Sequence, residues 1–557
     1  MIEFILNDDD IATDQPPGST VLDFVRSHKN LKGTKIGCRE GDCGACTILV
    51  GELRDGSVRY RTMTSCLMPL ANASGKHIVT IEGINPPDGS LTPVQQAMVD
   101  ESGTQCGFCT VGFVMSLTGF CLSERRRPRP HSLEDVQHRV SSVNNASTSP
   151  LEAAISSVDG NICRCTGYKS IERAAKLLSE PGAIATGFPL AVPNYFEGIA
   201  QRLSQLTDLP AETRAVAGVP FVAGGTDVYV QKPEQMTESA AANLFYDDYL
   251  RGIRDLGHTI EIGASATVTD LLESPVMNAA FPDLYKHLKL VSSTPIRNMA
   301  TLAGNFVNAS PIGDMTVWFL ALNAEISLGT RTPSSAWQQG GETTRTIPLS
   351  RLFRGYKQLA KEPDEYITAI RFKKPTADHY FNFEKVCKRT YLDIATVNTA
   401  ISLKCESLPG KEWTPPALSV AGGDLSVPPA VAGGDFSTQR REDAEEQNRP
   451  GSPPYQGGVD AALGGRGGSP PQTIEHLILD AHVSAGGVAP IPLYLKETSS
   501  FLVGRTLNEE TIEKANELMQ LEISPISDVR GTEAYKRLLL QQLFRAHFVE
   551  LFPNSLR

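Results

Sequence analysis

Three cysteines near the amino terminus have a spacing that suits an inorganic cluster. Cys38, Cys43 and Cys46 follow a C-x4-C-x2-C pattern, and Cys66 stands twenty residues further along. This is the pattern of plant-type [2Fe–2S] sites, in which four thiolates hold two bridged iron ions. A zinc site or a disulfide pair is the alternative, but zinc sites usually show paired C-x2-C units. The spacing therefore favours an iron–sulfur cluster.

The same loop contains three glycines, Gly37, Gly41 and Gly44. Because glycine adopts positive φ without a steric penalty, these positions allow a tight loop and a close approach of the backbone to the sulfurs. We expect N–H groups of the loop to point at the thiolates.

A second group of cysteines consists of a C-x2-C pair and a distant C-x-C pair. Cys106 and Cys109 precede an apolar helix predicted over 111–122, and Cys163 and Cys165 precede a helix for which Ser170 is the expected N-cap. Helix N-termini carry free N–H groups and a partial positive charge, which favours an anionic thiolate-bound cluster. From these residues alone, zinc and iron–sulfur remain equally open.

Bulk composition limits the class of protein. A length of 557 residues suggests about four domains. The net charge of −11 argues against nucleic acid as a partner, because phosphate binding needs a basic face. The first ten residues lack the features of a secretory signal, and no apolar run reaches the roughly 18 residues of a membrane span. Cysteines in close-spaced groups suit metal binding in a reducing compartment, so a cytoplasmic location is expected.

The elements that must position the first cysteine group are short strands around one helix. We expect a strand at 2–6, a helix after the N-cap Thr20, strands at 47–50 and 58–62 around a turn at 54–56, and a closing strand at 78–81. A small mixed sheet over one helix is the β-grasp arrangement. The next helix should begin at Thr92-Pro93 and end near Gly103, and residues 124–149, rich in Arg, Pro and Ser, should form a surface loop.

Two stretches further along could bind a nucleotide. Phe221–Val228 is predicted as a strand, a glycine turn and a return, and consecutive N–H groups in such a turn can cradle phosphate, although a plain tight turn is equally compatible. Residues 294–314 are dense in small and amide side chains. No G-x-G-x-x-G motif lies between a strand and a helix, so a Rossmann site is not supported.

The last part of the chain is interrupted by a low-complexity segment. A strand is predicted at 395–403, after which residues 406–471 are so rich in Gly, Pro, Ser and acidic residues that we expect a disordered insertion. Strands at 476–483 and 492–494 follow, and then two helices with Asn508 and Thr532 as their N-caps.

The three cysteine motifs together resemble a known family. GCREGDCGACT, TQCGFCT and GNICRCTGY follow one another as in the electron-transfer part of the molybdenum hydroxylases, the xanthine dehydrogenase and aldehyde oxidase family, and residues 1–85 resemble plant-type ferredoxins. The resemblance implies a second [2Fe–2S] cluster inside a four-helix bundle. Its implied ligands are Cys106, Cys109, Cys163 and Cys165. Cys121 is expected to be an apolar helix residue.

The two later stretches resemble the FAD-binding domain of the same family, which is of the vanillyl-alcohol-oxidase type. The resemblance implies that the following residues bind FAD: Phe221, Val222, Ala223, Gly224, Gly225, Thr226, Asp227, Val228, Thr301, Leu302, Ala303, Gly304, Asn305, Asp314, Ile367 and Lys385. Val291 stands where the family has an aromatic residue near the flavin.

The implied protein is a multidomain α+β electron carrier without catalytic residues of its own. Its expected parts are a ferredoxin-like domain at 1–85, a helical [2Fe–2S] domain at 86–180, an FAD-binding domain at 190–385 and a C-terminal flavoprotein domain, of the CO dehydrogenase type, at 386–557. No segment corresponds to the family's molybdopterin portion, so a separate large molybdenum subunit is the expected partner, in a higher hetero-oligomer.

By resemblance, electrons from hypoxanthine or xanthine would pass from molybdenum through the helical-domain cluster and then the ferredoxin-like cluster to FAD and NAD. Fusion of all these domains in one chain favours the xanthine dehydrogenase branch. An aldehyde or N-heterocycle oxidoreductase, a stand-alone flavin reductase and a zinc-binding scaffold remain the alternatives.

Overall fold

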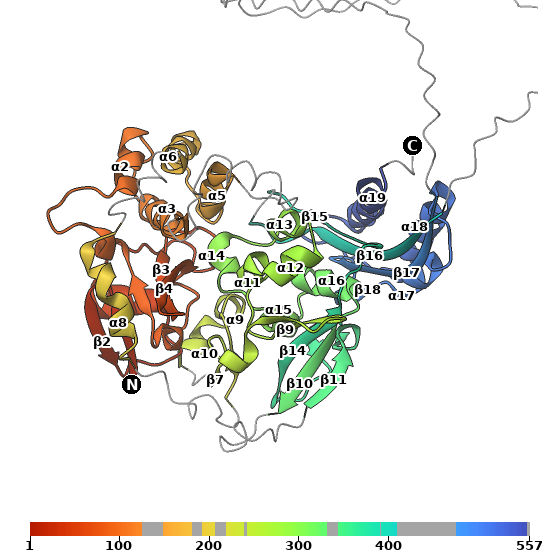
Figure 1. Ribbon diagram of the computed structural model, residues 1–557, viewed down its shortest axis with the longest axis horizontal. Helices are drawn as coiled ribbons and strands as arrows, with labels where there is room; N and C mark the ends of the chain where they lie inside the picture. The colour runs from red at the N-terminus through yellow and green to blue at the C-terminus, as the bar shows by residue number, and fades with distance from the viewer. Residues whose placement is uncertain are drawn as a thin grey trace, which may run out of the picture. The chain divides into compact units, whose positions relative to one another are not determined.

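The computed structural model describes residues 1–124, 149–180, 192–206, 219–238, 242–330, 344–389, 392–408 and 475–553 (Figure 1). The predicted linker at 181–190, nearly all of the predicted surface loop at 124–149 and nearly all of the predicted insertion at 406–471 lie outside these residues. Residues 1–407 and 476–557 belong to one compact unit, within which all contacts below are made.

The amino-terminal part is a five-stranded mixed sheet with strand order β2-β1-β5-β3-β4. Its strands are β1 (Ile2–Leu6), β2 (Asp9–Thr13), β3 (Thr47–Arg54), β4 (Ser57–Thr64) and β5 (His77–Val79). The predicted hairpin is confirmed, and its turn has positive φ at both Asp55 and Gly56, which suits a two-residue hairpin loop. The predicted last strand is shorter than expected and lies in the middle of the sheet, where it pairs in parallel with β1.

The helix on this sheet begins where the cap residue predicts. Thr20 Oγ1 accepts a hydrogen bond from Asp23 N at 3.1 Å, and α1 (Val21–Asp23) runs directly into the π-helical turn η1 (Phe24–His28). Two 3₁₀ turns, η2 (Leu70–Ala73) and η3 (Ile81–Ile84), complete this part. The sheet with its single helix confirms the β-grasp arrangement.

Four helices form the next part: α2 (Pro93–Asp100), α3 (Thr110–Glu124), α5 (Pro150–Ser157) and α6 (Lys169–Ser179). Thr92 caps α2 in a capping box with Gln95. The predicted cap of α6 is wrong: Tyr168, at φ 68°, is the N-cap, while Ser170 lies inside the first turn and is buried. Cys121 is buried in the bundle core, as predicted for an apolar helix residue.

The part predicted to bind FAD follows and is called the flavin domain below. Its short elements are η4 (Asn194–Gly198), α8 (Ile199–Leu203), β6 (Phe221–Val222), α9 (Val228–Gln231), α10 (Pro233–Glu238), β7 (Ala242–Asn243) and η6 (Asp248–Leu250). Its main sheet has the order β11-β10-β14-β9-β8. These strands are β8 (Ile253–Asp255), β9 (Thr259–Gly263), β10 (Glu325–Thr330), β11 (Thr344–Pro348) and β14 (Glu365–Lys373), with η7 (Leu349–Arg351), β12 (Phe353–Gly355) and β13 (Gln358–Leu359) beside them. Its helices are α11 (Val268–Glu273), α12 (Pro275–Ala280), α13 (Leu284–Leu288), α14 (Thr294–Arg297), α15 (Leu302–Asn308) and α16 (Asp314–Ala321).

The last part pairs a four-stranded sheet with three helices. The strands are β15 (His379–Val386), β16 (Val397–Leu408), β17 (Glu475–Gly486) and β18 (Leu493–Tyr494), and the helices are α17 (Lys496–Leu502), α18 (Glu509–Glu522) and α19 (Glu533–Leu551). Asn508 and Thr532 cap α18 and α19 as predicted. Strand β16 extends two residues past the expected start of the insertion.

The hydrophobic core of the ferredoxin-like part continues into the flavin domain. Val222, Tyr229 and Met299 of the flavin domain pack in one cluster with the buried face of the β-grasp sheet. The bundle, the main flavin sheet and the C-terminal sheet each have a core of their own. Among the described residues, no helix combines the length and apolarity that crossing a bilayer requires.

Candidate iron–sulfur and flavin sites

The first cysteine loop lies between η1 and β3, with Cys66 just after β4. Cys38 Sγ accepts hydrogen bonds from the backbone N–H groups of Glu40 (3.3 Å) and Asp42 (3.4 Å). Gly41 and Gly44 have positive φ, as predicted. Gly37 does not, but a Cβ there would lie 2.5 Å from the sulfur of Cys43, so this glycine is needed for close approach. The loop thus wraps N–H groups around a thiolate.

The four thiols of this loop approach one another in two pairs. A hydrogen bond from Cys43 lowers the pKa of Cys38 to about 5, and the same contact raises the pKa of Cys43 far above the usual range. Cys46 and Cys66 interact in the same way, and the shared hydrogen bond raises the pKa of Cys66. Two tetrahedral irons that share two sulfides need two thiolates each, so two pairs of thiols fit a [2Fe–2S] core.

The second cysteine group also comes together in two pairs. The sulfurs of Cys165 and Cys106 lie 3.7 Å apart, and Cys109 hydrogen-bonds Cys163. Burial first, and the contact with Cys163 second, raise the pKa of Cys109 to about 12. In the described residues, no group of three or more His, Cys, Asp and Glu side chains is arranged to hold a metal ion. Two pairs of thiols, as in the first group, fit a [2Fe–2S] core.

Backbone donors and a tyrosine support the second group. Cys163 Sγ accepts from the N–H groups of Cys165 (3.4 Å) and Thr166 (3.5 Å). The N–H of Cys163 donates to Tyr168 Oη at 3.0 Å. Cys109 directly precedes α3, and Cys165 lies four residues before α6. The predicted placement of both pairs at helix N-termini is confirmed.

The two cysteine loops touch each other directly. The N–H of Ile162, which precedes Cys163, donates to the carbonyl of Cys43 at 3.0 Å. Beside it, Asn161 Nδ2 donates to Gly44 O at 3.1 Å, and Ser116 Oγ of α3 donates to Asn161 Oδ1 at 2.7 Å. One hydrogen bond and the single residue Ile162 therefore join Cys43 of the first cysteine group to Cys163 of the second.

The first flavin stretch forms a strand and a glycine turn, but α9 follows in place of the predicted return. Tyr229 N–H donates to Gly225 O, which fixes the turn against the helix. The N–H groups of residues 223–227 have no acceptor within the described part of the chain. A run of free N–H groups in a glycine turn is an anion-binding nest, so the turn fits a pyrophosphate.

Within the second flavin stretch, the predicted FAD-binding residues 301–305 form the cap and the first turn of α15. Thr301 Oγ1 caps this helix by accepting from Gly304 N at 3.2 Å. Asn305 Oδ1 accepts from the N–H (3.1 Å) and the hydroxyl (2.9 Å) of Thr316 at the start of α16. The main-chain N–H groups of Leu302 and Ala303 donate to the carbonyls of Ala266 and Ala264, just after β9. Hydrogen bonds to neighbouring segments therefore hold this loop in place.

A buried cation links the flavin domain to the C-terminal sheet. Lys385 on β15, only 1 % exposed, lies 2.7 Å from Asp314 Oδ2 at the start of α16. Asn398 Nδ2 on β16 donates to Asp314 Oδ1 at 2.6 Å. Ile367 lies on β14 with its side chain in the core, and Val291 is buried in the same core. The structure thus brings Asp314 and Lys385 together, while Ile367 can offer a ligand only its backbone.

The first flavin turn lies against the ferredoxin-like part. A Cβ on Gly225, at φ 84°, would lie 2.6 Å from the carbonyl oxygen of Leu67, the residue after Cys66. Asn72 Nδ2 donates to Ala223 O at 3.1 Å from the same side. A predicted cluster ligand and a predicted flavin loop, far apart in sequence, are therefore neighbours.

Several residues that shape these sites were missed by sequence reasoning. Asn161, Asp159 and Tyr168 stand in or next to a cysteine motif but are not of a type that ligates iron, and Arg297 lies in a loop read only for its small residues. The Asp-Gly-Asn turn before Cys163 was the available signal.

Comparison with known proteins agrees with this arrangement. Four family descriptions match in chain order: "2Fe-2S iron-sulfur cluster binding domain" (4–71), "[2Fe-2S] binding domain" (80–176), "FAD binding domain in molybdopterin dehydrogenase" (198–375) and "CO dehydrogenase flavoprotein C-terminal domain" (472–551). The chain belongs to the molybdenum hydroxylase family. Within that family it has the iron–sulfur and FAD domains.

Relatives among the molybdenum hydroxylases are xanthine dehydrogenases. The enzyme of Emericella nidulans is 29% identical over 488 residues, which are 73% of this chain and 33% of that protein. Xanthine dehydrogenase 1 of Arabidopsis thaliana is 23% identical over 609 residues, covering 94% of this chain and 38% of that protein. The chain thus spans about a third of the length of the relatives it matches.

Two solved structures are also similar. Carbon monoxide dehydrogenase from Hydrogenophaga pseudoflava matches at 20% identity and a TM-score of 0.44, covering 61% of this chain and 91% of that one. Quinoline 2-oxidoreductase from Pseudomonas putida 86 matches at 16% identity and a TM-score of 0.42, covering 60% of this chain and 90% of that one.

Proposed function

We propose that the chain is the electron-transfer part of a molybdenum-dependent xanthine dehydrogenase, carrying electrons from a molybdenum centre through two [2Fe–2S] clusters to FAD. One observation carries the proposal: two four-thiol sites and a flavin loop follow one another in direct contact. Ile162 bonds to Cys43 across the first boundary, and Leu67 meets Gly225 across the second.

The proposed cluster ligands are the eight paired thiols. They are Cys38, Cys43, Cys46 and Cys66 for one cluster and Cys106, Cys109, Cys163 and Cys165 for the other. The proposed FAD contacts are the stretch 221–228 with the free N–H groups of residues 223–227, the loop at 301–305, Asp314, the backbone of Ile367, and Lys385. The domain boundaries inferred from the sequence, at about 85, 180–190 and 385, belong to the same proposal.

When bound, the clusters exchange single electrons and FAD takes up two, which allows delivery of a hydride to an acceptor. The chain's own residues set the conditions for this exchange. N–H donors to Cys38 and Cys163 stabilise negative charge on those sulfurs. The Lys385–Asp314 ion pair places a buried ammonium group, with its carboxylate partner, at the flavin domain's border with the C-terminal sheet.

Exposure and contacts of the cysteines support one order of transfer. Cys106 and Cys165 are exposed, so the helical site can face a donor on another protein surface. Cys46 and Cys66 are buried, and Cys66 lies next to the flavin turn. We therefore propose that electrons enter at the helical site, pass through the ferredoxin-like site and reach FAD.

The finer assignment concerns partner, substrate and acceptor. We propose a large molybdenum-cofactor subunit as the partner, hypoxanthine or xanthine as the substrate and NAD as the acceptor. The proposal of a purine substrate is supported by the similar proteins of Emericella nidulans and Arabidopsis thaliana, which are named xanthine dehydrogenases.

Purification of a tagged chain from its source under anaerobic conditions tests the proposal. We expect iron–sulfur and flavin absorption, molybdenum in a co-purifying polypeptide, and bleaching of the absorption by xanthine but not by an aldehyde. A colourless protein would refute the clusters. Bleaching by an aldehyde alone would leave the relay intact but refute the purine substrate.

A further inference from the structure

A single short segment of the flavin domain contacts both cysteine sites. Helix α14 and the two residues after it, Thr294–Met299, connect the core of the flavin domain to the loop at 301–305. Successive side chains of this segment reach different parts of the chain. A Cβ on Gly41 of the first cysteine loop would lie 2.7 Å from Ile296 Cδ1, and Met299 Sδ accepts from Thr64 Oγ1 at 3.5 Å.

Arg297 points toward the helical part and forms a buried ion pair with Asp159. The two side chains are 4 % and 5 % exposed, and Arg297 Nη2 lies 2.6 Å from Asp159 Oδ2. Arg297 Nη1 donates to the carbonyls of Val291 (2.9 Å) and Ser292 (2.7 Å). Asp159 Oδ1 accepts from the N–H of Thr294 at 2.7 Å. A desolvated pair with this many hydrogen bonds is stable only while both partners are present.

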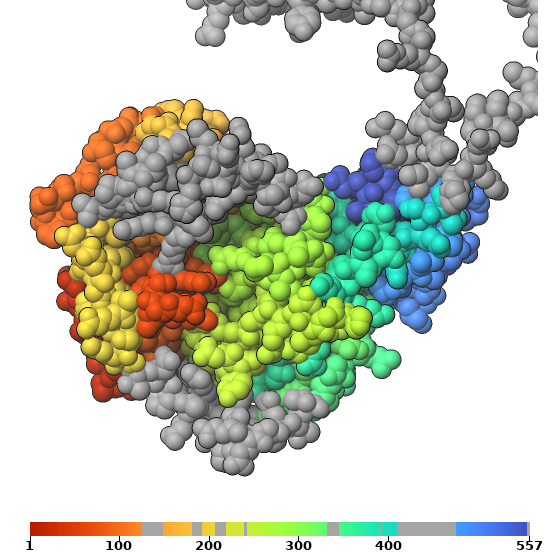
Figure 2. Space-filling model, in the orientation of Figure 1, coloured from red at the N-terminus to blue at the C-terminus, as the bar shows by residue number. Residues whose placement is uncertain are grey.

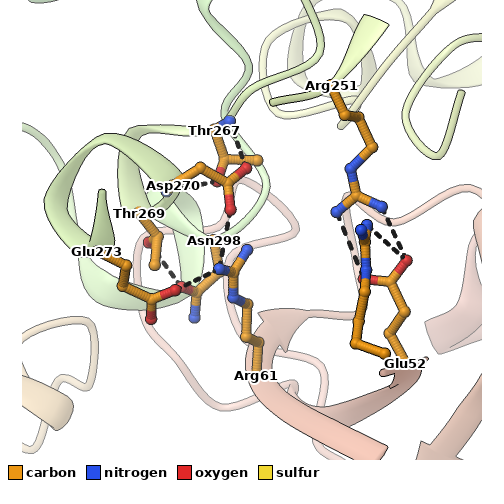
Figure 3. A network of polar contacts seen from close by, with 9 residues as sticks. Glu52, Arg61, Arg251, Thr267, Thr269, Asp270, Glu273 and Asn298 are labelled. Carbon is orange, nitrogen blue, oxygen red and sulfur yellow. Dashed lines mark hydrogen bonds and ion pairs between the residues drawn. The ribbon is translucent and has the colours of Figure 1, made fainter. Parts of the chain in front are cut away.

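Asn298, the next residue, points toward the ferredoxin-like part. Its Nδ2 donates to the carbonyl of Thr62 on β4 at 2.8 Å, and its Oδ1 accepts from Thr269 on α11 at 2.7 Å (Figure 3). Arg61 on β4 reaches Asp270 (2.8 Å) and Glu273 (2.6 Å) beside it. Arg297 and Asn298 are adjacent in the sequence, and their side chains bind the helical part and the ferredoxin-like part, respectively.

Further polar side chains line the seam, which is the boundary between the β3–β4 hairpin and the flavin domain. Figure 2 shows this seam where the orange surface of the hairpin meets yellow-green residues. A cavity of about 340 Å³ lies along it, lined by charged residues that include Arg61 and Asp270. Arg251 and Glu52 form a further ion pair, at 2.8 Å, which Figure 3 also shows. Of the ion pairs named in this segment and along the seam, Arg297–Asp159 is the least exposed to solvent.

Asp159 lies three residues before Ile162, whose N–H bonds to Cys43. Gly160, between them, packs against the flavin domain: a Cβ there would lie 2.9 Å from Ser293 Cβ. The turn 159–162 is consequently held on one side by Arg297 and on the other by the first cysteine loop. Its position fixes where Cys163 stands relative to Cys43.

We propose that Arg297 is a positioning residue for electron transfer: through Asp159 it docks the helical cluster site onto the ferredoxin-like site. This inference rests on the proposed function for the identity of the two centres. Loss of either member of the ion pair releases the turn 159–162 and weakens contact between the sites. The iron ligands themselves stay in place.

The test compares the full-length, cofactor-loaded protein with its Arg297→Gln, Arg297→Lys and Asp159→Asn variants. Hydrogen exchange read by mass spectrometry reports the N–H of Ile162, and electron paramagnetic resonance of the reduced protein reports the magnetic interaction between the two clusters. We expect the Ile162 peptide of the Gln and Asn variants to exchange on the order of 100-fold faster, the factor that loss of a buried ion-pair partner implies. The cluster interaction should weaken while each cluster keeps its own g values.

Two comparisons separate positioning from general damage. Arg297→Lys keeps the charge but loses the planar fork, so it should restore part of the protection. Arg173→Gln removes an exposed arginine paired with Glu101 within the bundle, and should leave both readouts unchanged. Wild-type exchange and an unchanged cluster interaction in Arg297→Gln and Asp159→Asn would overturn the inference. Absence of iron–sulfur absorption in the wild-type protein would instead overturn the proposed function.

Discussion

Two buried histidines should make the junction between the flavin domain and the C-terminal part sensitive to acid. His287 on α13 and His547 on α19 are 2 % and 0 % exposed, and both contact Asn382 on β15. His287 Nε2–H donates to Asn382 Oδ1 at 3.1 Å, whereas Asn382 Nδ2 donates to His547 Nδ1 at 3.1 Å. His547 Nε2–H then donates to Thr399 Oγ1 at 3.4 Å. This pattern is satisfied only when both rings are neutral.

Neither ring has an acceptor for the N–H group that protonation would add. A proton on His547 Nδ1 would face the amide donor of Asn382, and His287 Nδ1 is buried without a hydrogen-bond partner among the described residues. Burial accordingly lowers the pKa of His287 to about 4 and that of His547 to about 3, from 6.5. Because the folded-state pKa values are depressed, the contribution of the two neutral histidines to folding stability is complete above pH 6.5. It is lost as the pH falls toward 4 and 3.

The expected loss follows from these values. Between pH 7 and pH 5 each histidine becomes protonated in the unfolded chain but stays neutral in the folded protein. This lowers the free energy of unfolding by about 2 kcal/mol for each histidine, or about 4 kcal/mol for both. We expect the free energy of unfolding from urea titrations to fall by this amount more in the wild type than in a His287→Gln/His547→Gln variant. His258→Gln, at an exposed position of the flavin domain, is the matched control. An equal fall with pH in the wild type and the double variant would refute the reasoning.

Four further substitutions test the sites directly. Cys43→Ser and Cys163→Ser should each abolish one of two paramagnetic signals of the reduced, reconstituted protein; loss of both signals from either variant would contradict separate sites. Gly225→Ala should lower bound FAD with iron content unchanged, because φ 84° and the carbonyl of Leu67 cost a side chain about 1–3 kcal/mol; unchanged flavin content would count against the turn as the pyrophosphate site. Lys385→Met should destabilise the protein by roughly 3 kcal/mol in thermal unfolding, since Asp314 keeps a buried charge without its cation, and an unaltered melting temperature would contradict this.

Sequence reasoning succeeded wherever the signal was local. Thr20, Thr92, Asn508 and Thr532 begin helices because a cap residue needs only its next three neighbours. It failed at Ser170, where the left-handed Tyr168 ends the cysteine loop and starts the helix two residues early. The return predicted after the first flavin turn failed for a similar reason, since the turn at Gly225 leads into a helix whose first residues pack on the ferredoxin-like core.

The sequence by itself determined which residues could hold clusters, because ligands drawn from one loop must follow a spacing that the loop geometry imposes. Only the tertiary structure decided how the sites meet. Ile162 reaches Cys43, and Arg297 reaches Asp159 across 138 residues of chain. A hydrogen bond between such distant segments has no periodicity and no fixed spacing, because it forms only after several hydrophobic cores have packed and brought its two ends out of water.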